Sequence, residues 1–187
     1  MANRRIGTRI HISQSQGRWM ATISSDIPKW QRQSLELWTG AWLGLGCMLI
    51  YGVWSHSGSE AQFYGICLAF WSYFALKAWR AVRWRRGGME VIQLGEDGLQ
   101  IRMDHGANQG KAPWLPWGSL QPAEVLPTNP KSLLQSGEQQ FWVVGGERLQ
   151  VSVGSKIHMW GKQLPDQEAE ALCKSFNAAL NQLRPKG

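Results

Sequence analysis

The chain is poor in cysteine and lacks any cysteine pair with the spacing of metal ligands. Its 187 residues include three cysteines, Cys47, Cys67 and Cys173. An odd number, widely spaced, is also unlike the disulfide framework of a small secreted protein. We therefore expect the cysteines to pack as small apolar residues, and we expect no metal and no other cofactor.

Charged residues are absent from a long stretch in the first third of the chain. Leu37–Trp54 contains 18 residues without a charge, which as a helix at ~1.5 Å per residue nearly spans a hydrocarbon core of roughly 30 Å. A second apolar run, Ala61–Leu76, continues to about Val82 between basic residues that can reach the headgroups. The two runs predict two transmembrane helices. Two buried helices of a soluble protein are the alternative, but terminal tryptophans beside basic clusters disfavour it.

Lysine and arginine are missing from the short connection Ser55–Glu60, whereas they cluster before the first run and after the second. Cytoplasmic loops carry the excess of lysine and arginine in membrane proteins. The distribution therefore predicts a multi-pass protein with both termini in the cytoplasm.

The basic excess lies beside the apolar runs and not in the C-terminal half. Residues 1–86 carry a net charge of +8, and residues 87–187 carry −1. A nucleic-acid-binding protein concentrates its positive charge on the folded domain that contacts the phosphates. We therefore expect membrane lipid, and no nucleic acid, as a partner.

Two sets of residues are candidates for contacts in or near the membrane. Small residues allow helices to approach closely, either each other or the helices of another protein, and the candidates for helix packing are Gly40, Gly44, Gly65 and Ala69. Aromatic and basic residues favour the membrane interface or a partner surface, and these candidates are Trp38, Trp54, Trp79, Trp84, Arg83, Arg85, Arg86, Trp114 and Trp117. For the last two, covering the chain's own domain is the alternative.

No catalytic residue is expected. Transport or redox chemistry within the membrane requires ionisable residues inside the spans. Neither apolar run has an acidic residue, a histidine or an arginine at its centre. A pair of Cys173 and His158 can be drawn as nucleophile and base, but structural roles account for both residues better.

The remaining sequence predicts an N-terminal segment, residues 1–34, and a C-terminal domain, residues 87–187, on either side of a helical hairpin at 35–86. Ile10 and Ile12 alternate with polar residues in a hairpin pattern. A lone hairpin is marginally stable, so we expect it to pair with the C-terminal domain or with a partner.

Short strands separated by glycine turns follow Gly87, and they include the predicted strands Trp117–Leu126 and Phe141–Val144 around a polar loop, Pro127–Gln140. A helix from about Pro165 to Leu183 then carries one apolar stripe. The predicted fold class is an α+β membrane protein, in which a two-helix transmembrane hairpin is followed by a cytoplasmic antiparallel β-barrel-like domain with a C-terminal helix as its cap. The domain pattern is similar to that of pleckstrin-homology-like barrels.

Three stretches, Ile27–Leu37, Met89–Leu94 and Arg148–Leu183, resemble a family of uncharacterised bacterial integral membrane proteins with a two-helix hairpin and a small β-rich domain. The chain departs from the family pattern at Trp160 and Gln163, where isoleucine and phenylalanine are expected. The resemblance implies the bacterial inner (cytoplasmic) membrane. It also implies a respiratory context, because such proteins are associated with haem-copper terminal oxidases.

These observations favour a non-catalytic accessory or assembly subunit of a multi-subunit membrane complex, a respiratory terminal oxidase in the first instance. Other integral membrane subunits are then its partners. The alternative is a self-standing, membrane-tethered module that binds a peptide or a lipid through its cytoplasmic domain. An enzyme is the third and least favoured interpretation.

Overall fold

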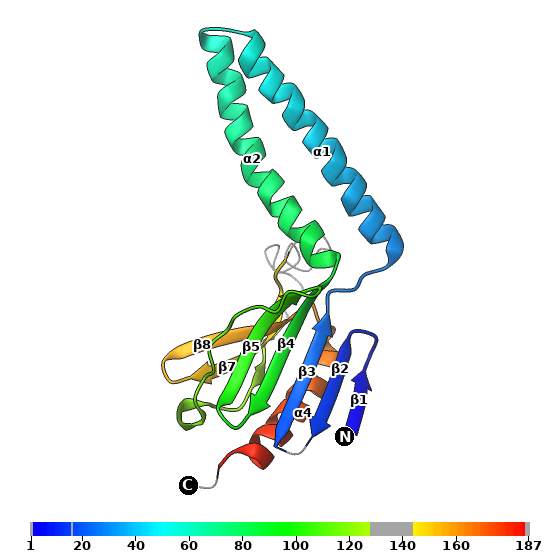
Figure 1. Ribbon diagram of the computed structural model, residues 1–187, viewed down its shortest axis with the longest axis vertical. Coiled ribbons are helices and arrows are strands. Elements are labelled where there is room, and N and C mark those ends of the chain that lie inside the picture. Colours follow the sequence, from blue (N-terminus) through cyan, green and yellow to red (C-terminus); the bar gives the residue numbers. More distant parts are fainter. Residues whose placement is uncertain (1, 16, 128–143, 186–187) are drawn as a thin grey trace. The chain divides into compact units, whose positions relative to one another are not determined.

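The computed structural model describes residues 2–15, 17–127 and 144–185 (Figure 1). These residues divide into two compact units. Residues 2–15, 17–26, 86–127 and 145–185 form one, which we call the β unit, and residues 27–85 with Val144 form the other, the helical unit. The chain thus leaves the β unit, runs through the helical unit and returns to the β unit.

The larger sheet of the β unit contains strands from both sides of the helical unit. It has the order β1-β2-β3-β4-β5, and every neighbouring pair is antiparallel. The strands are β1 (Ala2–Ile6), β2 (Ile10–Ser15), β3 (Arg18–Ser24), β4 (Gly88–Gly95) and β5 (Gly98–His105). The prediction that the N-terminal hairpin pairs with the C-terminal domain is confirmed, since β3 pairs with β4 from Trp19 opposite Leu94 to Ser24 opposite Met89.

The smaller sheet has three antiparallel strands in the order β6-β7-β8. They are β6 (Glu124–Val125), β7 (Glu147–Val153) and β8 (Lys156–Lys162). The predicted strand Trp117–Leu126 is wrong for most of its length. A 3-10 turn, η1 (Trp117–Ser119), occupies its start, and only two residues pair as β6, as expected for a segment that Pro122 interrupts. Most of the predicted strand Phe141–Val144 and of the predicted loop Pro127–Gln140 lies outside the described residues.

One helix, α4 (Asp166–Leu183), covers the larger sheet (Figure 1). Its apolar stripe was expected, and Ala169, Leu172 and Phe176 on it are fully buried. Phe176 makes an edge-to-face contact with Trp19 of β3 and also packs against Trp160 of β8. Helix and both sheets therefore share one apolar core. Trp160, a departure from the resembled family, is part of that core.

The helical unit contains α1 (Lys29–Ser55) and α2 (Ser59–Arg85). Two glycines of α1 form the close contacts with α2. A methyl group on Gly46 would collide with the ring of Trp71, and one on Gly52 would collide with the ring of Tyr64. The Trp71 indole Nε1 also donates a hydrogen bond of 2.8 Å to the backbone carbonyl of Trp42. Bulky aromatic rings lying on glycine thus set the spacing of the pair.

The predicted fold class is wrong. In the part of the chain that is described, the eight strands form two antiparallel sheets, three of the strands precede the helices, and no closed barrel follows them. The sequence pattern concealed this arrangement because local alternation shows which segments are strands but not which strands become neighbours. Inserting two helices between β3 and β4 leaves the local pattern of either strand unchanged.

The prediction of a multi-pass inner-membrane protein with two cytoplasmic termini is also overturned. Of the three helices in the described residues, only α1 is long and apolar enough to be a candidate span. The uncharged stretch of α2 has 16 residues and is followed by Lys77, Arg80, Arg83 and Arg85. These charges make α2 too polar to count as a second span.

Candidate interaction surfaces

The most unusual surface of the protein is the exposed apolar surface of α1 and α2, which we call the helical surface. Sixteen of the twenty large hydrophobic side chains that are exposed in the described residues lie on these two helices. Nine of the sixteen are aromatic, and their exposed fractions range from 48% for Phe74 to 87% for Trp54. Only 17% of an apolar 18-residue stretch of α1 is buried. Helix α1 is therefore not a core helix of the described fold.

The predicted helix-packing residues do not hold α1 and α2 together. A methyl group added to Gly40, Gly44 or Gly65 would meet no described atom within 4 Å, and Ala69 is exposed. The small residues that do lie between the helices are Gly46 and Gly52, which a G-x-x-x-G search does not select. Gly40 and Gly44 therefore do not pack α1 against α2. Their contact with the helices of another protein stays a prediction.

The aromatic and basic candidates divide into exposed and buried residues. Trp38, Trp54 and Trp79 are at least half exposed on the helices, and Arg83 and Arg86 are exposed as well. Trp84 and Arg85 are instead almost completely buried, at 3% exposure each. Trp38, Trp54 and Trp79 lie on the surface that a partner or lipid can contact, whereas burial removes Trp84 and Arg85 from such a surface.

The segment around Trp114 and Trp117 packs on its own sheet. The Trp117 indole Nε1 donates to the backbone carbonyls of Gly95 and Glu96 in the β4–β5 turn. Leu115 exchanges backbone hydrogen bonds with Leu99 of β5, at 2.7 and 2.9 Å. Both rings are partly buried. The segment therefore covers the chain's own domain, which was the alternative to a partner contact.

Cys173 and His158 do not form a nucleophile–base pair. The Cys173 thiol donates to the Ala123 carbonyl, and Asn177 contacts both the Ala123 carbonyl and the sulfur. Burial raises the pKa of the Cys173 thiol above its usual value of 9.0, only partly offset by the hydrogen bond with Asn177. A neutral, buried thiol is a poor nucleophile, so Cys173 anchors the loop before β6 to α4.

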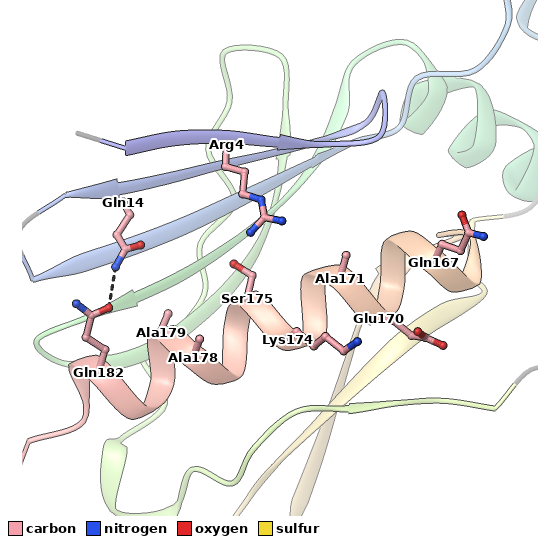
Figure 2. Close-up of a pocket in the computed structure, with 10 residues that line it drawn as sticks. All are labelled: Arg4, Gln14, Gln167, Glu170, Ala171, Lys174, Ser175, Ala178, Ala179 and Gln182. Atoms are coloured by element: carbon pink, nitrogen blue, oxygen red, sulfur yellow. Dashed lines mark hydrogen bonds between the residues drawn. The ribbon is translucent and has the colours of Figure 1, made fainter.

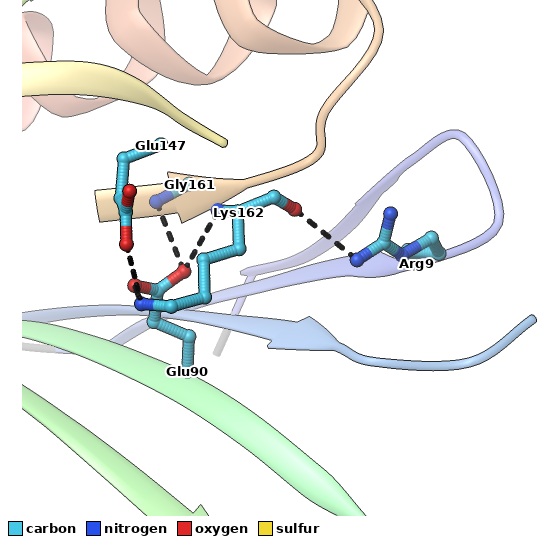
Figure 3. A network of polar contacts seen from close by, with 5 residues as sticks. All are labelled: Arg9, Glu90, Glu147, Gly161 and Lys162. Atoms are coloured by element: carbon cyan, nitrogen blue, oxygen red, sulfur yellow. Dashed lines mark hydrogen bonds and ion pairs between the residues drawn. The ribbon is translucent and has the colours of Figure 1, made fainter. Parts of the chain in front are cut away.

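A buried charged cluster that sequence reasoning missed joins the two sheets (Figure 3). Glu90 of β4, 1% exposed, accepts hydrogen bonds from the backbone N–H groups of Gly161 and Lys162 in β8, at 2.9 and 3.1 Å. The Lys162 ammonium lies 3.4 Å from Glu90 and 3.0 Å from Glu147. The Glu90 carboxylate thus accepts hydrogen bonds from N–H groups of β8. In a closed barrel, the backbone carbonyls of a neighbouring strand would accept such bonds.

Arg9, in the turn after β1, extends this cluster. Its guanidinium donates to the carbonyls of Ser24, Lys162 and Gln163. Burial lowers the pKa of Arg9, while the carboxylates of Glu168 and Glu90 act in the opposite direction. The cluster therefore ties β2, β3 and β8 together at one end of the β unit. Because its members are far apart in sequence, no local motif reveals it.

A polar groove of about 560 Å³ lies between β1, β2 and α4 (Figure 2). Arg4 points from β1 toward α4, and Ser175 and Ala171 face it from the helix. A hydrogen bond of 3.0 Å between Gln14 and Gln182 crosses the groove near one end of α4. It is the second surface with features suited to binding.

The described residues contain no group of three or more histidine, cysteine, aspartate or glutamate side chains that could hold a metal ion. The comparisons add no relative: no protein-family model, curated protein or solved structure matches the chain. The resemblance to the uncharacterised two-helix family therefore stays a prediction.

Proposed function

We propose that this protein is a non-catalytic accessory or assembly subunit of a multi-subunit membrane complex and that the helical surface is where it joins that complex. The exposure of sixteen large apolar side chains on α1 and α2 carries the proposal. Soluble monomers rarely expose continuous apolar patches above a few hundred Å².

The size of the helical surface can be judged from its aromatic residues. A fully exposed aromatic side chain offers about 150–250 Å², so nine such residues, each roughly half exposed or more, present on the order of 1,000 Å². That area is comparable with one side of a stable protein interface, and contact with lipid would cover it equally well. Some apolar environment must therefore cover α1 and α2.

The chemistry of the surface favours docking over catalysis. Its exposed residues are mainly aromatic or aliphatic, and exposed basic residues lie at the end of α2 in Arg80 and Arg83. Aromatic side chains on rigid helices are the residue types that dominate interfaces. The resemblance to the two-helix family makes a respiratory terminal oxidase the first complex to examine.

The proposal is tested by extracting the full chain in a mild detergent and measuring the native mass of the particle. We expect additional integral membrane subunits in fixed ratio to this chain. A lone monomer or homodimer, with no other subunit, would contradict the proposal.

A matched pair of substitutions locates the contact. Ile66 on α2 and Ile157 on β8 have nearly equal exposure, 60% and 59%, so serine at either position changes a similar amount of free surface. Ile66→Ser should release the other subunits. Ile157→Ser should retain them, and equal loss in both variants would show that the helical surface is not the docking site.

A second candidate function is a membrane-tethered module that binds a ligand through the β unit, and the groove beside α4 favours it. Testing it with residues 88–187 alone would fail, because β1, β2 and β3 supply three of the five strands of the larger sheet. The ligand test therefore requires the full chain.

A further inference from the structure

The groove beside α4 lies along an edge of the larger sheet. In the described residues β1 pairs only with β2, so the backbone groups along its other side are free to bond with another chain. Such an edge is a template for strand addition. The groove continues from this edge to α4 and is lined there by Ala171, Ser175 and Ala178, short side chains that leave room between helix and strand (Figure 2).

The dimensions suit a short extended segment. The groove follows α4 from Gln167 to Gln182, fifteen steps or about 22 Å at ~1.5 Å per residue. An extended chain advances ~3.3 Å per residue, so six or seven residues span the same length. The five residues of β1 extend about 16 Å at ~3.3 Å per residue, so they can pair with about five of these residues.

Charge gives the groove a preference among such segments. Arg4 and Lys174 line it together with one acidic residue, Glu170. Arg4 stands opposite Ile12 in the ladder with β2, and Ile12 is buried, so Arg4 lies on the face of the sheet that is turned toward α4. An arginine on the core-facing side of an edge strand has to reach an anion or water to be stable.

We propose that an extended segment of a partner protein, with acidic side chains at alternate positions, adds to β1 as a sixth strand and directs its carboxylates to Arg4 and Lys174. Strand addition supplies backbone hydrogen bonds, and alternate side chains supply specificity. The helical surface has no part in this interaction, so the inference goes beyond the proposed assembly role and can succeed or fail independently of it.

Two other roles for the edge of β1 and for Arg4 and Lys174 predict results that differ from those of strand addition. Charged residues on edge strands can simply prevent aggregation, in which case no peptide binds. Anionic lipid could use the same two cations through its phosphate group, in which case the backbone edge of β1 takes no part in binding.

The experiment selects ligands for the full chain in detergent from a phage-displayed library of random heptapeptides. We expect enrichment of peptides with glutamate or aspartate at alternate positions and without proline in the centre. Hydrogen exchange then compares the free protein with the complex of one selected synthetic peptide. Amides of residues 2–6 should become protected, because the added strand bonds to that edge.

Variants locate the site, with Arg5→Glu as the control. Arg5 has the same charge on the same strand but lies on the opposite face from Arg4. Arg4→Glu should weaken binding at least about tenfold through loss of a charge-assisted contact, and Ala178→Trp should block the groove without changing its charge. Arg5→Glu should bind within about twofold of the wild type, with each variant first shown to be folded by circular dichroism.

Several results would overturn the inference. These are the absence of any enriched peptide, binding that survives both Arg4→Glu and Ala178→Trp, and complex formation without protection of residues 2–6. Bicelles that contain phosphatidylglycerol provide the lipid comparison. Binding of these bicelles that Arg4→Glu weakens, and that leaves the amides of residues 2–6 unprotected, would assign the groove to lipid instead.

Discussion

Glu90 is a charged residue in a position where most proteins place an apolar one. It is 1% exposed, and its carboxylate is satisfied by two backbone N–H groups and by the ammonium of Lys162. A buried ion pair often stabilises a protein no more than apolar residues of the same volume would, yet removing one partner is costly. Glu90 therefore fixes where β8 lies against β4, and its loss leaves buried polar groups without partners.

Replacing Glu90 with alanine should lower the free energy of unfolding by about 3–5 kcal/mol, because the N–H groups of Gly161 and Lys162 lose their acceptor in a buried site. Urea denaturation, followed through hydrogen exchange of the β7 and β8 amides, measures the change. Glu147→Gln is the control, since Glu147 contacts the same Lys162 ammonium but its side chain is 29% exposed. It should cost about 1 kcal/mol or less. Equal effects of the two substitutions would contradict the role assigned to Glu90.

Cys173 should make the stability of the β unit depend on alkaline pH. Its thiol has a raised pKa in the folded chain because it is buried, so the folded protein holds this proton at pH values where the unfolded chain has lost it. Stability from this group is therefore complete below pH 9.0, the ordinary value, and declines as the pH rises toward the folded pKa. Cys173→Ser retains a donor to Ala123 but does not titrate in this range, so its stability should fall less between about pH 8 and pH 10. Parallel curves for both proteins would refute the assignment.

Among the elements, the two long helices depend on glycines that no common packing motif identifies. Gly46 and Gly52 lie under aromatic rings of α2. A methyl group added to Gly40 or Gly44, the G-x-x-x-G pair, would instead meet no atom of α2 within 4 Å. A glycine matters for packing only where the facing helix supplies a large ring, and sequence spacing within one helix does not contain that information.

Gly46→Leu should separate α1 from α2, because the new side chain would occupy the place of the Trp71 ring. Spin labels on the native Cys47 and Cys67, in a Cys173→Ser background, report the distance between the helices. We expect a longer and broader distance distribution for Gly46→Leu. Gly44→Leu is the control, because it changes the helix propensity of α1 by the same amount as Gly46→Leu. It should leave the distance distribution unchanged, since a methyl group at position 44 would meet no neighbouring described atom within 4 Å. A similar shift in both variants would mean that helix distortion, and not contact with Trp71, is responsible.

At the scale of the whole molecule, the helical unit is an insertion into a turn between two paired strands. Ser25 donates a backbone hydrogen bond of 3.0 Å to Gly88, directly beyond the last pair of β3 and β4. Every described residue in the core of the β unit belongs to that unit. Its stability should therefore not require α1 or α2.

Deleting Ile27–Arg86 should yield a folded β unit that is soluble without detergent. The deletion places Asp26 next to Gly87, and Asp-Gly is a favoured two-residue connection between antiparallel strands. It also removes sixteen of the exposed large apolar side chains. Size-exclusion chromatography in plain buffer should show a monomer, and circular dichroism should show a cooperative unfolding transition. Aggregation, or a spectrum of an unfolded chain, would show that the helical unit is needed for folding.

The local elements of this protein can be predicted from its residues, because their signals are periodic and short-ranged. The uncharged run after Leu37 identifies α1, the stripe through Leu172 and Phe176 identifies α4, and the alternation around Ile10 and Ile12 identifies an N-terminal hairpin that needs a partner strand. Each signal depends on residues within a few positions of one another.

The way in which these elements are combined depends on long-range contacts in the folded chain. The pairing of β3 with β4 across the helical insertion, the replacement of a closed barrel by two sheets joined through Glu90, and the contact of Gly46 with Trp71 all link residues that are distant in sequence. The energies that select such contacts come from burial and hydrogen bonding between elements, and these terms exist only once the chain has folded.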